Sequence, residues 1–339
     1  MSGLLDNLKI DRFVFPHQLD LMNDSVLLVR LSNADLRDHS FLDQRILRQG
    51  MTHEWLRWSE FEAVAQTLSK KVPAYIFHVG HCGSTLLSRL VCAATDTQAL
   101  REPLPMRTIA FDQADGRAAL LADDVLRARL HIFERVWARG PSKTVVKASS
   151  ICSNLMERID SAAPIAFVYQ QPETHLAVTL AGENTLQDLR GFAQNRYRRL
   201  QERDIDMRPL AAFTVGELAA LTWLTEAVSA SRVLTRRMVA TLDFDRFLEQ
   251  PDDSLADVCR HLDLETGPER CRIALNGPIM RTYSKAPEHA YRPELRNEII
   301  GDSRVRNSNE IARGMRWING LAARNAEVTA AVNALSSAP

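Results

Sequence analysis

The sequence has no excess of charge of either sign. Lysine and arginine together number 42, as do aspartate and glutamate, so the formal net charge is zero at neutral pH. A chain without net charge creates no global field that draws it to nucleic acid or to an anionic membrane. We therefore expect no nucleic-acid partner, and any anion site must be built locally.

Cysteine is scarce and shows no pairing. The five cysteines form no Cys-x-x-Cys pair and no His-Cys ligand spacing, which disfavours a disulfide framework and a metal site. They are Cys82, Cys92, Cys152, Cys259 and Cys271. An odd, scattered set predicts reduced thiols in a cytoplasmic setting.

Long apolar runs are missing as well. Residues 1–11 contain early acidic residues and no apolar core of signal length, and no later run is long enough to span a bilayer. We expect a soluble, cytoplasmic protein without a membrane span. At 339 residues, the chain can form one large α/β domain, or one domain plus an extension.

The most informative segment that is present covers residues 74–90. A short apolar run rich in β-forming residues leads into a glycine-containing turn, and Ser84 and Thr85 then open an apolar segment with helical spacing. Backbone N–H groups in such a turn and at the start of the helix can hold anionic oxygens. The nucleotide-hydrolysing pattern, GxxxxGK followed by Ser or Thr, needs a lysine where this chain has Ser84. The segment therefore predicts a phosphate-binding loop without the lysine that assists phosphoryl transfer.

This loop resembles the 5′-phosphosulfate loop of sulfotransferases, which typically reads Lys/Arg-Ser-Gly-Ser/Thr-Thr before an apolar helix. The matching residues are His81-Cys82-Gly83-Ser84-Thr85, with His81 in place of the basic residue. The alternative is an ordinary strand–turn–helix unit in which Ser and Thr merely cap the helix.

Later segments resemble further elements of the same family, in the same order. Residues 99–103 resemble a strand that ends in Glu-Pro, and residues 144–150 a buried strand that ends in lysine and hydroxyl residues. Residues 164–172 resemble a strand that usually ends in Arg-Asp/Asn-Pro. Residues 240–251 resemble a strand, an acidic-aromatic turn and a proline-led helix. The resemblance covers roughly residues 74–300.

Strands that alternate with helices predict an α/β fold with a mostly parallel sheet covered on both faces, and the resemblance implies a three-layer, P-loop-like arrangement. We divide the chain into an N-terminal extension packed on the main domain (1–70), the sulfotransferase-like P-loop domain (71–320) and a C-terminal helix that frays into a tail (321–339). In the extension, residues 26–31 predict a strand. Residues 54–70 predict an amphipathic helix whose tryptophans pack in the core or, alternatively, form a substrate platform.

Four polar residues stand at or just past the ends of predicted strands, and we expect them at one rim of the sheet, where ligands of parallel α/β sheets bind. They are His81, Glu102, Lys147 and Gln170.

The resemblance implies that a sulfonate is transferred from 3′-phosphoadenosine-5′-phosphosulfate (PAPS), with Glu102 and Lys147 in catalytic roles. Glu102 would be the base for an acceptor hydroxyl, or else a structural carboxylate paired with Arg101 or Arg107. Lys147 would bind the oxygen that bridges sulfonate and phosphate. A lysine that ends an apolar strand is costly unless it meets an anion, so its alternative is an ion pair with a carboxylate of the chain.

Two loop residues have open roles. His81 could replace the missing basic residue if protonated, or donate an N–H to the sulfonate if neutral, because histidine titrates near neutral pH. Cys82 lies near a helix N-terminus, an environment that activates thiols, so it is either a reactive thiol or a small spacer.

The residues that would recognise the 3′-phosphate of PAPS depart from the family pattern. Where the family has an arginine and, further on, a serine, this chain has Gln170 and Val178, with Thr179 adjacent. A bidentate arginine contact is worth about 1.5–3 kcal/mol, so the donor is bound differently, bound weakly, or is not PAPS. Arg281 or Lys285 could supply the missing charge from a late loop.

Three functions are consistent with these residues. The first is a PAPS-dependent sulfotransferase acting on a hydroxyl or amine of a small molecule. The second is a P-loop kinase or NTPase, which Ser84 in the lysine position disfavours. The third is a catalytically degenerate sulfotransferase fold that binds a nucleotide or a partner protein, which Gln170 and Val178 favour.

Overall fold

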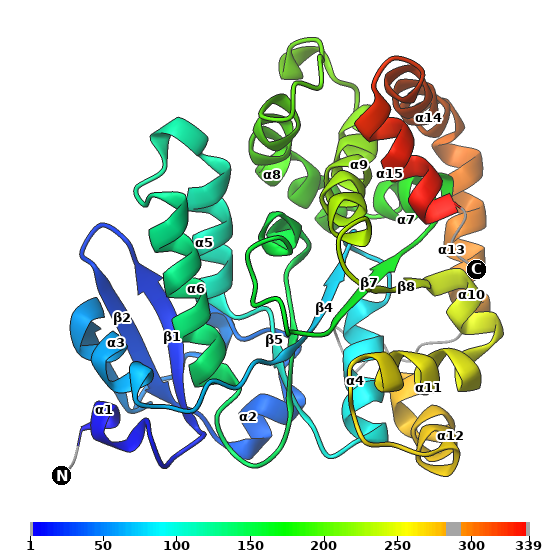
Figure 1. Ribbon diagram of the computed structural model, residues 1–339. Helices are drawn as coiled ribbons and strands as arrows, with labels where there is room; N and C mark the ends of the chain where they lie inside the picture. The colour runs from blue at the N-terminus through cyan, green and yellow to red at the C-terminus, as the bar shows by residue number, and fades with distance from the viewer. Residues whose placement is uncertain (1–2, 283–292, 337–339) are drawn as a thin grey trace.

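The computed structural model describes residues 3–282 and 293–336 and contains two sheets (Figure 1). The first is antiparallel, in the order β1 (Val14–Asp20), β2 (Ser25–Arg30) and β3 (His53–Arg57). The second is parallel, in the order β5 (Gln98–Arg101), β6 (Thr144–Lys147), β4 (Ala74–His78), β7 (Ile165–Tyr169) and β8 (Ala240–Asp243). The expected α/β fold, with a parallel sheet flanked by helices, is confirmed.

Helices connect the strands and cover the sheet. Those nearest to the site are α4 (Ser84–Ala94), α5 (Leu104–Ala114), α7 (Pro172–Leu180), α8 (Glu183–Gln201), α9 (Val215–Leu234), α10 (Phe244–Glu249) and α13 (Pro293–Arg306). Further α-helices are α1 (Leu4–Asn7), α2 (Asn33–Asp38), α3 (Trp58–Gln66), α6 (Asp123–Trp137), α11 (Pro251–His261), α12 (Pro268–Asn276), α14 (Ser308–Ala322) and α15 (Ala326–Ser336). Short 3-10 helices are η1 (Gln44–Ile46), η2 (Gly116–Ala118), η3 (Ser150–Leu155), η4 (Leu210–Ala212) and η5 (Pro278–Arg281).

The parallel sheet follows from strands that are apolar on both faces. Every residue of β4, β6 and β7 is buried, as expected for strands covered on both sides. The strand β4 is central, and the chain leaves it for the edge strand β5 before it returns across β4 to β7. The loop after β4 therefore lies at the switch point of the sheet, where ligands of such folds bind.

The N-terminal extension shares a core with the main domain. The rings of Trp58 and Phe61 in α3 each lie 5.6 Å, between centroids, from the ring of Phe133 in α6. Core packing is therefore confirmed for Trp58. It is wrong for Trp55, which is 48 % exposed, because residues 53–57 form the strand β3 and the helix begins only at Trp58. The backbone of β2 offers this segment an antiparallel partner, and that pairing prevails over the helical spacing of its apolar residues.

The C-terminal segment is packed up to the last described residue. The helix α14 crosses the boundary that we drew at residue 321, and α15 then buries Val328, Ala331 and Leu335. The side-chain amide of Gln171, just after β7, donates to the carbonyl of Leu335 at 3.3 Å. This segment therefore supports the end of β7, and its last helix continues to Ser336.

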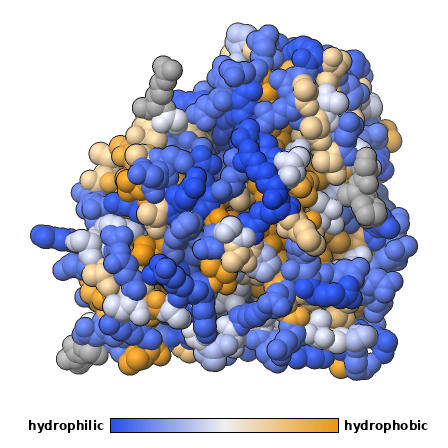
Figure 2. All heavy atoms as spheres, in the orientation of Figure 1, coloured by the Kyte–Doolittle hydropathy of each residue, from blue (hydrophilic) through white to orange (hydrophobic). Residues whose placement is uncertain are grey.

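The surface is mostly polar on the face that Figure 2 shows, with hydrophobic residues scattered among hydrophilic ones. Within the described residues, no helix is both long and apolar enough to cross a membrane.

Candidate functional site

The loop between β4 and α4 has the backbone of an anion-binding turn. Gly80, His81 and Gly83 have φ angles of 89°, 51° and 72°, a left-handed conformation found in backbone nests that hold anions. Ser84 and Thr85 are buried and begin α4. The first N–H groups of a helix have no partner within it, and together with the helix dipole they favour an anion. The structure thus brings His81, Gly83, Ser84 and Thr85 to one helix start.

Close packing fixes the position of this loop. A Cβ atom on Gly83 would lie only 2.0 Å from Cε2 of Phe244, the first residue of α10. Phe244 is covered in turn by Arg296 of α13, whose Cζ lies 5.4 Å from the centre of the ring. Arg296 also donates to Asp245 at 2.5 Å. Glycine is therefore required at position 83 for steric as well as conformational reasons.

Two residues expected near the donor have side chains that are occupied inside the protein. The thiol of Cys82 is buried and donates to the carbonyl of Val168 at 3.3 Å, an arrangement typical of a small spacer. Thr179 is buried in α7, and its hydroxyl donates to the carbonyl of His175 at 2.7 Å. Val178 beside it is half-buried.

Glu102 and Lys147 meet at the carboxyl ends of β5 and β6. The ammonium group of Lys147, which is 1 % exposed, forms an ion pair with Oε1 of Glu102, and the hydroxyl of Ser149 donates to Oε2 at 2.7 Å. The backbone N–H of Glu102 donates to the carbonyl of Lys147 at 2.7 Å. A buried ammonium group needs such a partner, because its desolvation is costly. The ion pair that the sequence left as an alternative for Lys147 is therefore present.

Arg101, the neighbour of Glu102, binds the N-terminal extension instead. Its buried guanidinium group donates to the carbonyls of Leu36, Arg37 and His39 at 3.0, 3.3 and 2.9 Å. This commits Arg101 to the C-terminal end of α2, and removes it as the structural partner considered for Glu102.

His78 connects the end of β6 to the loop between β4 and α4 (residues 79–83), which we call the phosphate loop after its expected ligand. Its Nε2 lies 2.9 Å from the carbonyl of Ala148, and its Nδ1 accepts the N–H of Gly80 at 2.9 Å. This pattern assigns the proton to Nε2 and leaves the ring neutral. The ends of β4 and β6 are thereby held together, so the Glu102–Lys147 pair and the loop share one rim of the sheet.

A charged cluster that we did not predict from the sequence contacts the loop at His81. We call it the α8 cluster, and it consists of Asp188, Arg196 and Arg199 of α8 with Glu226 of α9. Nε2 of His81 lies 3.7 Å from Oδ2 of Asp188. Arg196, which is 1 % exposed, lies 3.6 Å from Asp188 and 3.7 Å from Glu226, and Arg199 pairs with Glu226 at 2.7 Å.

Just after β7, two side chains are buried without hydrogen bonds to any residue that the structure describes. They are Gln170, through both amide atoms, and His175, through both ring nitrogens. Burial, followed by the nearby positive charges of His81 and Arg196, lowers the pKa of His175 to about 3, so its ring is neutral. Buried polar atoms without partners are rare in native proteins. A polar ligand bound here would therefore be favoured.

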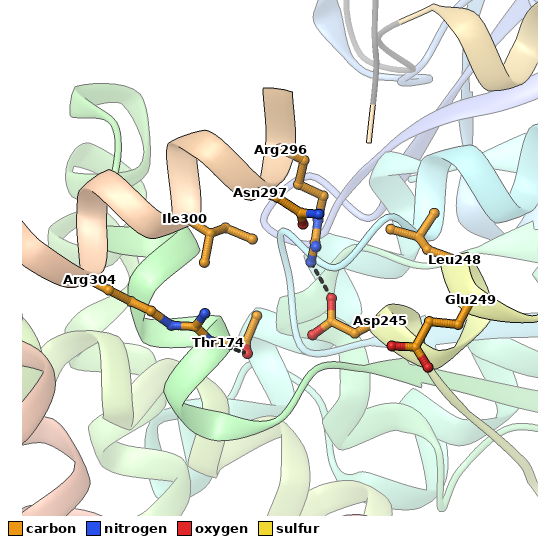
Figure 3. A pocket seen from close by; sticks show the side chains of 8 residues that line it. All are labelled: Thr174, Asp245, Leu248, Glu249, Arg296, Asn297, Ile300 and Arg304. Atoms are coloured by element: carbon orange, nitrogen blue, oxygen red, sulfur yellow. Dashed lines mark hydrogen bonds and ion pairs between the residues drawn. The ribbon is translucent and has the colours of Figure 1, made fainter. Parts of the chain in front are cut away.

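A cavity of about 330 Å³ opens between α7, α10 and α13 (Figure 3). Arg304 of α13 donates to the hydroxyl of Thr174 in α7 at 3.2 Å. Arg296 lines the cavity and also covers Phe244, which packs on Gly83, so the cavity adjoins the phosphate loop. The lining residues are Thr174, Asp245, Leu248, Glu249, Arg296, Asn297, Ile300 and Arg304.

The sequence analysis did not find Arg296 or Arg304. Of the residues that we expected to supply positive charge near the donor, Arg281 is exposed at the end of η5, and Lys285 lies outside the described residues. In residues 3–282 and 293–336, no group of three or more His, Cys, Asp or Glu side chains could hold a metal ion.

No protein-family model matches the chain, and no curated protein matches it either. Among solved structures, the chain is similar to the sulfotransferase domain from the curacin biosynthetic pathway, with 12 % identity over 66 % of this chain and 84 % of that one and a TM-score of 0.37. It is also similar to the sulfotransferase domain from the Synechococcus PCC 7002 olefin synthase, with 13 % identity over 70 % and 91 % of the two chains and a TM-score of 0.35. At these levels of similarity, function has to be inferred from the residues of this chain.

Proposed function

We propose that this protein is a sulfotransferase that moves a sulfonate group from PAPS to a hydroxyl or amine of a small molecule. The observation that carries the proposal is the Glu102–Lys147 pair. It lies on the same rim of the sheet as a phosphate loop that has Ser84 where a phosphoryl-transfer enzyme has lysine.

The roles follow from the chemistry. Sulfuryl transfer, like phosphoryl transfer, has a loose transition state in which charge builds up on the leaving phosphate, so the protein chiefly positions groups and stabilises charge. The loop N–H groups would hold the phosphosulfate, and Lys147 would stabilise the negative charge on the bridging oxygen. Glu102 would accept the proton of the acceptor, a contribution of ~10²–10⁴ in rate. Ser149, bonded to the second oxygen of that carboxylate, would keep it oriented.

The donor nucleotide would be held by ligands that differ from the family pattern. Gln170 offers hydrogen bonds but no charge, and Thr179 is left out because its hydroxyl bonds within α7. Arg296 and Arg304 would supply the positive charge from the cavity beside the loop, since a guanidinium group suits phosphate oxygens well. Carboxylates share that cavity, so we expect only a modest preference for nucleotides that carry a 3′-phosphate.

One alternative has a specific observation in its favour. Lys147 is already neutralised by Glu102, and the family's arginine is replaced by Gln170, as in a degenerate fold that binds a nucleotide without transferring sulfonate. A kinase or NTPase is less consistent with the loop, because Ser84 cannot stabilise a transferring phosphoryl group as lysine does.

Ligand-induced thermal stabilisation separates these functions. We expect 3′,5′-ADP to raise the melting temperature more than AMP or ATP does. A ligand present at about 100 times its Kd adds about 2.7 kcal/mol to the free energy of unfolding, so the effect is measurable. We also expect the native protein to transfer ³⁵S-sulfonate from labelled PAPS to a mixture of small alcohols, phenols and amines. Binding without transfer would favour the degenerate fold, and stabilisation by ATP alone would favour the kinase.

Matched arginine variants test the donor site. Arg304→Gln and Arg296→Gln should weaken 3′,5′-ADP binding about tenfold, the value of a charge-assisted contact. Arg281→Gln, at an exposed position, serves as the control and should leave binding unchanged. If Arg281→Gln weakens binding and the other two variants do not, the positive charge that binds the donor comes from the late loop that we first considered.

A further inference from the structure

The N-terminal extension reaches the rim of the parallel sheet next to Glu102. The N–H of Leu42 donates to the carbonyl of Arg101 at 2.7 Å, while the guanidinium group of Arg101 holds the carbonyls that end α2. Arg89 of α4 donates to the carbonyl of Asp38 and to the hydroxyl of Ser40, at 2.9 and 3.1 Å. The segment after α2 is thus fixed to β5, which ends in Arg101, and to the helix that begins at the phosphate loop.

This anchored segment presents a charged pair and an aromatic ring. Arg45 pairs with Asp43 at 2.6 Å, and its Cζ lies 3.9 Å from the centre of the Phe41 ring. The guanidinium side chain of Arg45 remains 61 % exposed, whereas the carboxylate side chain of Asp43 is mostly covered. The contacts with Asp43 and Phe41 therefore restrict the side chain of Arg45, which still has N–H donors available to a ligand.

The charged side chains of this segment interact electrostatically with Glu102 and Arg107. The hydrogen bond with Asp43 raises the pKa of Arg45, and the charge of Glu102 raises it further. Burial opposes ionisation of Asp43, but Arg45 and, more weakly, Arg107 lower its pKa below the usual value. Arg107 lies at the end of the first turn of α5, after Glu102 and Pro103. Arg45, Asp43, Glu102 and Arg107 therefore form one electrostatic group at this rim.

With Lys147 included, the balance of this group is positive. Glu102 neutralises Lys147, and Asp43 neutralises Arg45. Arg107 forms no ion pair with any residue in the described part of the chain; its guanidinium group lies over the Phe192 ring at 5.9 Å. One positive charge is thus left beside the proposed base, together with the exposed donors of Arg45.

We infer that the segment from Phe41 to Arg45 completes the acceptor side of the site, and that Arg45 and Arg107 select an acceptor that carries an anionic group next to the hydroxyl or amine that is modified. A carboxylate would meet the planar donors of both arginines. The inference rests on the proposed function, because it treats Glu102 as the base. It gives the extension, which lies outside the family resemblance, a specificity role.

The test uses the full-length protein saturated with 3′,5′-ADP and probes that differ by one charge. One pair is salicylate and 2-hydroxybenzyl alcohol, and a second is 3-hydroxybutyrate and 1,3-butanediol. We expect the native protein to bind the anionic member of at least one pair about tenfold more tightly by calorimetry, and to lose much of this preference in high salt. If no pair shows a preference for its anionic member, the inference is wrong.

Three variants locate the effect. Arg45→Gln and Arg107→Gln should each remove most of the preference while leaving the affinity for 3′,5′-ADP unchanged. Arg37→Gln is the matched control, because Arg37 lies in α2, shortly before this segment, and pairs with Asp38 at 2.7 Å on the surface. If Arg45→Gln and Arg107→Gln both retain the preference, these arginines do not select the acceptor. Failure of 3′,5′-ADP itself to bind contradicts the proposed function instead, so the two failures are distinguishable.

Discussion

The two sides of the phosphate loop satisfy their buried polar groups in opposite ways. On the β6 side, Lys147 and Ser149 both bond the carboxylate of Glu102. On the β7 side, Gln170 and His175 have buried polar atoms without hydrogen-bond partners among the described residues. The first arrangement is complete before any ligand binds, and breaking it leaves a buried charge. The second is improved by a polar ligand, and its polar atoms contribute little to folding.

The strongest test of this difference between the two sides is the substitution Glu102→Gln. The substitution leaves the buried ammonium group of Lys147 without its carboxylate, and removing one partner of such a pair typically costs about 3–5 kcal/mol. We expect a loss of this size in urea unfolding and no sulfonate transfer. Adding Lys147→Met should restore most of the stability and none of the transfer. If Glu102→Gln alone is as stable as the native protein, the ion pair does not stabilise the β6 side.

Gly83→Ala should have the next largest effect. The new methyl group would strike Phe244, and residue 83 would keep a φ of 72°, so overpacking and backbone strain together should cost about 2–4 kcal/mol. Gly50→Ala is the control, because Gly50 has a φ of 79° and no neighbouring atom within 4 Å. It should show only the strain, about 1 kcal/mol. Equal losses in the two variants would mean that Phe244 does not hold the loop.

His175 tests the β7 side through pH. The unfolded chain binds a proton at this histidine below about pH 6.5, whereas the folded chain does so only below about pH 3. Native stability should therefore fall as the pH drops between these values. In His175→Leu this dependence is absent, so the variant should gain about 2 kcal/mol relative to the native protein between pH 7.5 and pH 5. Parallel stability curves for the two proteins would contradict the buried, neutral ring.

Gln170→Met should have the smallest effect on folding. Its amide atoms have no hydrogen-bond partner among the described residues, so an unbranched apolar side chain of similar size should change the free energy of unfolding by less than about 1 kcal/mol. The affinity for 3′,5′-ADP should fall about three- to tenfold if the amide contacts the donor. A large loss of stability with unchanged affinity would place Gln170 among the structural residues.

The fold was predictable because its signals are local. Apolar strands such as residues 74–78 and 165–169, each followed by a turn and a helix, identify a parallel sheet without knowledge of long-range contacts. The strand β3 escaped prediction because its pairing with β2 is a tertiary event, which the apolar spacing around Trp55 and Trp58 does not encode.

The candidate site was predictable only where its residues follow a strand end. Glu102 and Lys147 both belong to that class, and they meet in the structure. Arg196 and Arg296 do not, because they lie within helices, and helical spacing alone does not say which of several arginines turns inward. Arg45 lies in a part of the chain that resembles no family element, so its approach to Glu102 depends on the anchoring by Arg101, which only the fold reveals.

The aromatic contacts between α3 and α6 have a consequence for how the molecule comes apart. Trp58 and Phe61 precede the parallel sheet in the chain, while Phe133 and Trp137 belong to its flanking helix, and their rings form one contiguous cluster. Separating the extension would expose this cluster and would also leave the buried guanidinium group of Arg101 without its carbonyl partners. The extension and the sheet should therefore melt together in a single cooperative transition, and a truncated chain that begins at the phosphate-loop strand should not hold its shape.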